Sequence, residues 1–193
     1  MKNNPIFIYN TLTRKKEKFE PLKKGTVKMY ICGITPYDDT HLGHGRCYVT
    51  FDMIRRYLEY KGFKVDYIQN VTDIDDKIIK RAREDKDDSK NIKEKCRQLT
   101  EKYFSEYRNL MTRLNVREPT MFVKATETIT DMQAVISTLM QKGFAYEVDG
   151  DVYFSVRKFA DYGKLSGRNI NEMRSGARVE IDERKKDPLD FAL

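Results

Sequence analysis

Hydrophobic and less hydrophobic side chains alternate along residues 26–32, and this period of two predicts a β-strand. From about residue 43 to residue 61 the apolar side chains follow helical spacing instead. They stand at Cys47, Phe51, Ile54 and Leu58. This spacing predicts one apolar face of a helix, and Gly62 stands where a C-terminal cap belongs.

A second strand is predicted over residues 64–70, where Val65 and Ile68 supply apolar side chains. A strand, a helix and a further strand within about 45 residues form a βαβ unit. Such a unit implies a parallel strand pair joined by a right-handed crossover. We therefore predict an α/β fold that contains the first half of a doubly wound parallel nucleotide-binding sheet.

Three more helices and several short strands are predicted further along the chain. The helices cover 77–83 (beginning near Asp75), 92–114 and 129–141, and the strands cover 144–146, 152–156 and 178–181. We divide the chain into an N-terminal arm (1–25), the first half of the nucleotide-binding fold (26–119) and a small α+β insertion lobe (120–193). The last segment, 187–193, resembles a turn that leads into a new apolar element.

Composition narrows the class of protein. The 193 residues include 37 Lys or Arg against 30 Asp or Glu, a formal charge of +7, and 12 Tyr and 10 Phe supply core material. No apolar run approaches the roughly 20 residues that span a bilayer, and residues 1–5 have no apolar signal region. Three cysteines without a CxxC pair favour the reducing cytoplasm.

The excess positive charge lies mostly in residues 77–117, with 13 Lys or Arg against 7 Asp or Glu. This stretch is either a solvated helix face or a contact surface for nucleic acid, and charge alone leaves both interpretations open.

Candidate chemistry is concentrated in residues 32–46, which join the first strand to the first helix. Ligands of α/β sheets bind at the carboxyl ends of strands, and helix N-termini favour anions. The only two histidines, His41 and His44, flank Gly43 at this point and could donate to phosphate oxygens. Gly43 would let a flat group approach the backbone. The alternative is a helix cap with two surface histidines.

Other polar residues carry two interpretations each. Cys32 is either a ligand for a soft metal or a small buried apolar side chain. Thr72 either faces the same crevice as Cys32 or caps the next helix. Asp73, Asp75 and Asp76 are expected to cap that helix and pair with basic neighbours rather than to bind a cation. Cys47 is expected in the core, and Cys96 on the surface or as core filler.

Several motifs carry a resemblance to a known family. His41-Leu42-Gly43-His44 resembles the HIGH motif of the class I aminoacyl-tRNA synthetases, and the chain is most similar to the cysteinyl-tRNA synthetases. The segments that carry this further likeness are 29–35 (MYICGIT), 70–79 (NVTDIDDKII), 162–166 (YGKLS), 176–179 (GARV) and 187–193 (DPLDFAL). The resemblance runs from about residue 5 to the end of the chain.

The resemblance implies activation of L-cysteine by ATP, with magnesium, and transfer to tRNA(Cys). It implies catalytic His41 and His44, and ATP binding by Ile34, His41, Gly43 and His44. Cysteine or the adenylate would be bound by Cys32, Gly33, Thr35, Asn70 and Thr72. Cys32 would also be one of four protein ligands of a zinc ion that recognises the substrate thiol. Zinc would separate cysteine from serine, which a hydrophobic pocket does by only about 1–3 kcal/mol.

The chain also departs from the family pattern, because it has no histidine after His44 and no cysteine after Cys96. The remaining zinc ligands, the KMSKS motif and the helical anticodon-binding region are all absent. We therefore expect the amino-terminal part of a longer synthetase, inactive by itself. Two alternatives stay open: a cysteine:amino-sugar ligase of the mycothiol type, and a short non-catalytic module that binds nucleic acid or a partner.

Overall fold

The computed structural model describes residues 5–87, 89–170 and 183–193. The described residues form two compact units. The first unit is Glu20–Ile129, and the second unit combines Pro5–Phe19 with Thr130–Leu193.

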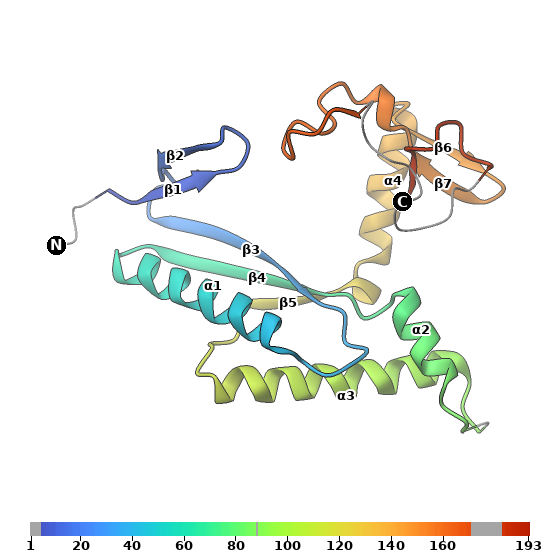
Figure 1. Cartoon of the computed structure of the whole chain (residues 1–193), viewed down its shortest axis with the longest axis horizontal. Coiled ribbons are helices and arrows are strands. Elements are labelled where there is room, and N and C mark those ends of the chain that lie inside the picture. Colours follow the sequence, from blue (N-terminus) through green and yellow to red (C-terminus); the bar gives the residue numbers. More distant parts are fainter. Residues whose placement is uncertain (1–4, 88, 171–182) are drawn as a thin grey trace. The chain divides into compact units, whose positions relative to one another are not determined.

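A parallel three-stranded sheet forms the centre of the first unit (Figure 1). Its strands are β3 (Thr26–Ile34), β4 (Lys64–Val71) and β5 (Met121–Lys124), in the order β3-β4-β5. Helix α1 (Leu42–Tyr60) connects β3 to β4, and these two strands are parallel. The predicted βαβ unit and α/β class are confirmed.

Two helices pack on one face of this sheet, as Figure 1 shows. They are α1 and α3 (Ile92–Arg113), and α2 (Asp76–Arg83) precedes α3. The rings of Tyr48 on α1 and Tyr107 on α3 meet edge to face, with centroids 5.3 Å apart. All three helices lie within two residues of their predicted ends.

Alternate positions of β3 and β4 supply the core beneath these helices: Val27, Ile31, Ile34, Val65, Tyr67, Gln69 and Val71 are buried. Gln69 is only 1% exposed, yet its Nε2 donates to the Tyr107 hydroxyl at 2.8 Å. The buried carboxylate of Asp52 accepts from Nε of Arg56 at 2.6 Å. Buried polar groups are tolerated here because each has a partner.

The helix ends follow ordinary capping chemistry. Gly62 has φ +93° after α1, which is the left-handed conformation that favours glycine, so its predicted role is confirmed. Asp75 caps α2, and its Oδ1 accepts from the backbone N–H of Lys77 at 2.9 Å. The capping interpretation of Thr72 is therefore wrong, since Asp75 holds that position.

The second unit contains two antiparallel sheets and one helix. A hairpin joins β1 (Phe7–Asn10) to β2 (Lys15–Lys18). After α4 (Ile129–Gln141), the strands β6 (Ala145–Val148), β7 (Asp151–Phe154) and β8 (Phe191–Ala192) pair in the order β6-β7-β8. Single 3-10 turns cover Ala125–Glu127 and Val156–Lys158. No helix of the described residues is long and apolar enough to cross a membrane.

Aromatic rings and one carboxylate hold the second unit together. Phe154 on β7 stacks with Phe191 on β8, with ring centroids 5.3 Å apart. Asp190, 2% exposed, accepts from the Val156 N–H at 2.9 Å and from the Tyr146 hydroxyl at 2.7 Å. The segment after residue 187 thus forms a turn that closes this small sheet.

The two compact units divide the chain at other points than the boundaries expected from the sequence. Residues 121–124 continue the parallel sheet as β5, whereas a lobe boundary was expected at 119/120. The β1–β2 hairpin, within the expected N-terminal arm, belongs to the second unit. The expected strand at 178–181 and the motif at 176–179 lie outside the described residues. Which functional lobes the two units represent stays a prediction.

Candidate active site

A β-bulge marks the carboxyl end of β3. Ile31 lies opposite Gln69 and Ile34 opposite Val71, so two residues of β3, Cys32 and Gly33, face the single residue between them on β4. A Cβ on Gly33 would overlap the backbone carbonyl of the facing strand, so this position requires glycine. Bulges re-aim side chains and are frequent beside active sites.

Cys32 presents an exposed thiol at this bulge. Its backbone carbonyl accepts from the Tyr48 hydroxyl at 3.2 Å, which ties the strand end to α1. The interpretation of Cys32 as a small buried side chain is wrong, whereas its role as a metal ligand stays a prediction. Cys47 and Cys96 are both half-buried, and burial raises the pKa of each thiol.

The two histidines form a capping box at the start of α1. His41 is the N-cap, and its Nδ1 accepts from the Gly43 N–H at 3.1 Å. Nδ1 of His44 accepts in return from the His41 N–H at 3.3 Å. The imidazole rings stack, with centroids 3.9 Å apart and an interplanar angle of 15°. The capping alternative is therefore correct as a description of local structure.

The same hydrogen bonds fix the tautomer of both rings. A neutral imidazole that accepts at Nδ1 carries its proton on Nε2, so each histidine keeps one N–H donor outside the cap. Burial and the neighbouring His41 lower the pKa of His44 and favour the neutral form. The start of α1 therefore combines the positive end of the helix dipole with two imidazole donors, a suitable chemistry for phosphate.

Gly43 makes room for the stacked histidines. A Cβ at this position would stand 2.9 Å from Cε1 of His41. Glycine therefore prevents a clash within the capping box, and its expected contact with adenine stays a prediction.

A hydrogen-bonded cluster links the ends of β3 and β4. Oδ1 of Asn70 accepts from the Gly33 N–H at 2.6 Å and from the Tyr30 hydroxyl at 2.9 Å, and Nδ2 donates to Thr72 Oγ1 at 3.2 Å. The Thr72 N–H donates to the Ile34 carbonyl at 2.9 Å. The structure thus brings together four of the residues expected from the sequence, together with Tyr30.

Ile34 is 5% exposed, so its side chain is buried in the core at the end of β3. Thr35 is half-buried, and its carbonyl accepts from the Tyr37 N–H at 3.0 Å. Whether either contacts ATP or cysteine stays a prediction.

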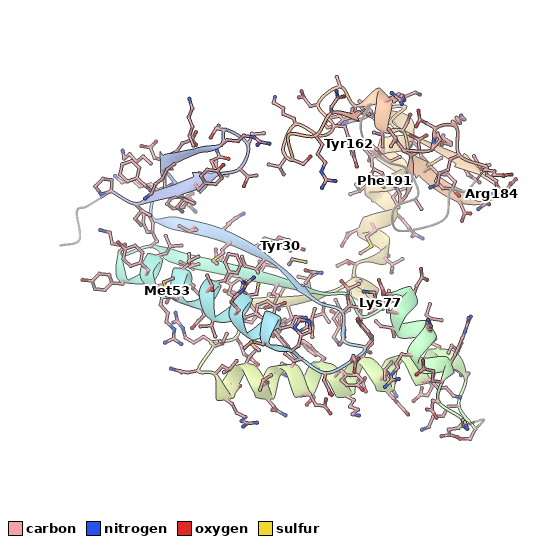
Figure 2. All side chains as sticks on the ribbon, in the orientation of Figure 1. Tyr30, Met53, Lys77, Tyr162, Arg184 and Phe191 are labelled. Atoms are coloured by element: carbon pink, nitrogen blue, oxygen red, sulfur yellow. The ribbon has the colours of Figure 1, made fainter. Side chains whose placement is uncertain are left out.

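Three residues near the site were not singled out from the sequence. Tyr30 and Tyr48 supply the hydroxyl contacts described above, and Lys77 places its ammonium 5.3 Å from the ring centroid of Tyr37. Figure 2 shows Tyr30 on β3 and Lys77 at the start of α2. The sequence could have indicated Tyr30, because residues two apart on a strand point to the same face and Tyr30 stands two positions before Cys32.

Of the acidic residues after β4, Asp75 caps α2 as expected, and Asp76 lies in the first turn of that helix. Asp73 does not cap α2, because it accepts from the Thr126 N–H at 3.0 Å and from the Thr126 hydroxyl. The expected pairing with basic neighbours stays a prediction. Across residues 5–87, 89–170 and 183–193, no group of three or more His, Cys, Asp or Glu could hold a metal ion. Of the three cysteines, Cys32 is the exposed one, and an exposed sulfur donor has suitable chemistry for zinc.

A parallel sheet whose first strand leads into a His-Leu-Gly-His helix start is the arrangement of class I aminoacyl-tRNA synthetases. A crystal structure described as an arginyl-tRNA synthetase from Campylobacter jejuni shares this fold, with a TM-score of 0.56 and 14% identity. The match covers 74% of this chain and 40% of that one.

Residues 18–193 match the family described as tRNA synthetases class I (C) catalytic domain, and the chain belongs to this family. A cysteine–tRNA ligase of Caldicellulosiruptor saccharolyticus is 54% identical over 186 residues, which is 96% of this chain. The chain spans 38% of the length of that relative.

Proposed function

We propose that this chain is the amino-terminal part of a cysteine–tRNA ligase. That enzyme converts L-cysteine and ATP to cysteinyl-adenylate and pyrophosphate, and then transfers cysteine to tRNA(Cys). The observation that carries the proposal is the 54% identity to a cysteine–tRNA ligase over 96% of the chain. Because the chain spans 38% of that relative, we infer that it does not complete the reaction alone.

His41 and His44 act on the phosphates of ATP in this proposal. Negative charge moves onto the leaving pyrophosphate as the cysteine carboxylate attacks the α-phosphorus. The two Nε2–H groups donate to these phosphate oxygens, and magnesium accompanies the nucleotide. Donors that are held in place before the reaction stabilise such charge with little reorganisation. Gly43 and the main chain at Ile34 border the adenosine.

The bulge of β3 and the end of β4 receive the amino acid. We assign the contacts to cysteine or its adenylate to Cys32, Gly33, Thr35 and Thr72, and Asn70 lies beside them, hydrogen-bonded to Gly33 and Thr72. The exposed Cys32 sulfur would be one zinc donor, and since no group of three or more candidate ligands gathers among the described residues, further donors would come from residues outside them. Zinc, when bound, supplies a soft Lewis acid that keeps a thiol deprotonated near neutral pH.

Cysteine-dependent ATP–pyrophosphate exchange by the complete ligase tests the proposal. His41→Asn keeps a good N-cap residue but removes the imidazole, and His41→Ala removes both. We expect exchange to fall by about 100-fold in both variants, the size found when one pre-set donor is removed. The unfolding midpoint should fall only in His41→Ala. Unchanged exchange in His41→Asn would refute the phosphate role.

Product analysis in the same enzyme separates the alternatives. Charging of tRNA(Cys) supports the ligase, and attachment of cysteine to an amino sugar would identify the mycothiol type. A complete protein without any cysteine-dependent exchange would identify a non-catalytic module.

A further inference from the structure

We propose that Asn70 is a positioning residue for the amino-acid side of the site. Its side-chain amide holds the β-bulge that presents Cys32, and it orients the Thr72 hydroxyl. This inference rests on the proposed function, and it assigns to Asn70 an action through its neighbours rather than through contact with substrate.

The bulge creates the need for such a residue. An inserted residue leaves its backbone groups outside the regular ladder. At this bulge, where the register of β3 against β4 shifts, the Gly33 N–H donates to Oδ1 of the Asn70 side chain at 2.6 Å. The Asn70 side chain therefore supplies an acceptor where the ladder is irregular, and the N–H of the half-buried Gly33 would lose that partner without it.

The position of the bulge sets the direction of Cys32. Successive side chains of a strand point to opposite faces, so a shift of the bulge by one residue would turn Cys32 to the other face. Burial along β3 agrees with the observed register: Ile31 and Ile34 are both buried while Cys32 between them is exposed. A contact that fixes the bulge at this point therefore keeps the thiol on the exposed side.

The remaining contacts of the amide fix its orientation. The Gly33 N–H is only a donor, so the atom that faces it must be Oδ1. The Tyr30 hydroxyl, on a side chain that is 64% exposed, donates to the same oxygen at 2.9 Å. Nδ2 consequently faces Thr72 Oγ1, at 3.2 Å. One amide thus joins the bulge of β3 to the residue that follows β4.

Steady-state kinetics of the complete, zinc-loaded ligase test this role, with the Michaelis constants for cysteine and ATP measured separately. Asn70→Ala removes the amide, and we expect KM for cysteine to rise about tenfold or more, because its three hydrogen bonds, to Gly33, Tyr30 and Thr72, are lost. KM for ATP should stay within about twofold, since the hydrogen bonds that hold the capping box run among His41, Gly43 and His44. Asn70→Asp keeps an oxygen acceptor for the Gly33 N–H and the Tyr30 hydroxyl, so its KM for cysteine should lie close to the wild-type value.

Gln69→Ala is the matched control. Gln69 is the preceding residue and carries the same amide, but it points into the core and bonds Tyr107. We expect this variant to lower the unfolding midpoint without a change in KM for cysteine. A rise of KM for cysteine of the same size in both variants would reduce the Asn70 effect to general destabilisation and overturn the proposal.

Further outcomes are equally decisive. An active Asn70→Ala enzyme with an unchanged KM for cysteine overturns the positioning role. A larger loss in Asn70→Asp than in Asn70→Ala also overturns it, because charge repulsion would then indicate direct contact with the cysteine carboxylate. If Asn70→Ala does not fold, Tyr30→Phe replaces it, because this variant removes only the hydroxyl that donates to Asn70 Oδ1. A rise of KM for cysteine by about threefold or more supports the positioning role, and an unchanged KM for cysteine overturns it. A wild-type enzyme without cysteine-dependent exchange refutes the proposed function itself.

Discussion

The capping box of α1 should lose stability in mild acid, because a protonated Nδ1 cannot accept a backbone N–H. Burial and the stacked His41 ring lower the pKa of His44 below its ordinary value of 6.5. The unfolded chain then binds a proton more readily than the folded chain. The free energy of unfolding is therefore at its full value above about pH 6.5, and it falls as the pH drops from there to the lowered pKa.

The size of the effect follows from the cap. Loss of one N-cap hydrogen bond costs about 1 kcal/mol, and the half-buried His44 ring lets water replace part of it. We therefore expect a decrease of about 0.5–1 kcal/mol on acidification. His44→Gln keeps an acceptor at the third position after the N-cap, as in an ordinary capping box, but it does not titrate. This variant should match the wild type at pH 7.5 within about 0.5 kcal/mol.

Urea unfolding followed by circular dichroism at several pH values between 7.5 and 5.5 measures the difference. Carboxylates also titrate, but they are common to all variants, so the comparison isolates His44. The His44→Gln curve should decline less than the wild-type curve, and His44→Ala should be about 1 kcal/mol less stable already at pH 7.5. Parallel curves for wild type and His44→Gln would refute the linkage between His44 protonation and the cap.

Two further changes test the polar groups of the two cores. Tyr107→Phe removes the hydroxyl that accepts from the buried Gln69 amide. Urea titrations should show a free energy of unfolding lower by about 1–3 kcal/mol, because a buried donor is left without its partner. A decrease below about 0.5 kcal/mol would contradict the contribution of this hydrogen bond. Asp190→Ala leaves the buried Val156 N–H without its side-chain acceptor and should lower the thermal unfolding midpoint of the second unit by several degrees. Asp190→Asn keeps an oxygen acceptor, so its unfolding midpoint should lie close to the wild-type value.

Periodicity identified the elements that bury one continuous face. β3, α1, β4 and α3 each repeat apolar side chains over two or more turns or over several strand positions, so their local pattern is sufficient. β5 is only four residues long, and its identity as a strand depends on pairing with β4. The β1–β2 hairpin is polar on most positions, with Lys15–Lys18 forming one strand. Neither carries an alternation long enough to identify it.

The polar contacts of the core lie beyond what hydrophobic spacing can predict. The expected face of α1 omitted Asp52, which is buried because Arg56 and Arg117 supply its partners from within α1 and from the loop after α3. Partners that are 65 positions apart in sequence meet only through the fold. Thr72 and Asp75 illustrate the same limit: both are good N-cap residues, and only backbone geometry selects Asp75.

The two interpretations of the histidine pair, helix cap and phosphate donor, do not compete for the same atoms. Nδ1 of each ring belongs to the cap and Nε2 remains for a ligand. An N-cap and the third residue of a helix are the two positions that a capping box joins, which accounts for the spacing of His41 and His44. Gly43 lies between them because a Cβ would meet the His41 ring. The cap therefore sets the direction of both Nε2 donors before any phosphate arrives, and the motif performs its structural and its proposed chemical role at once.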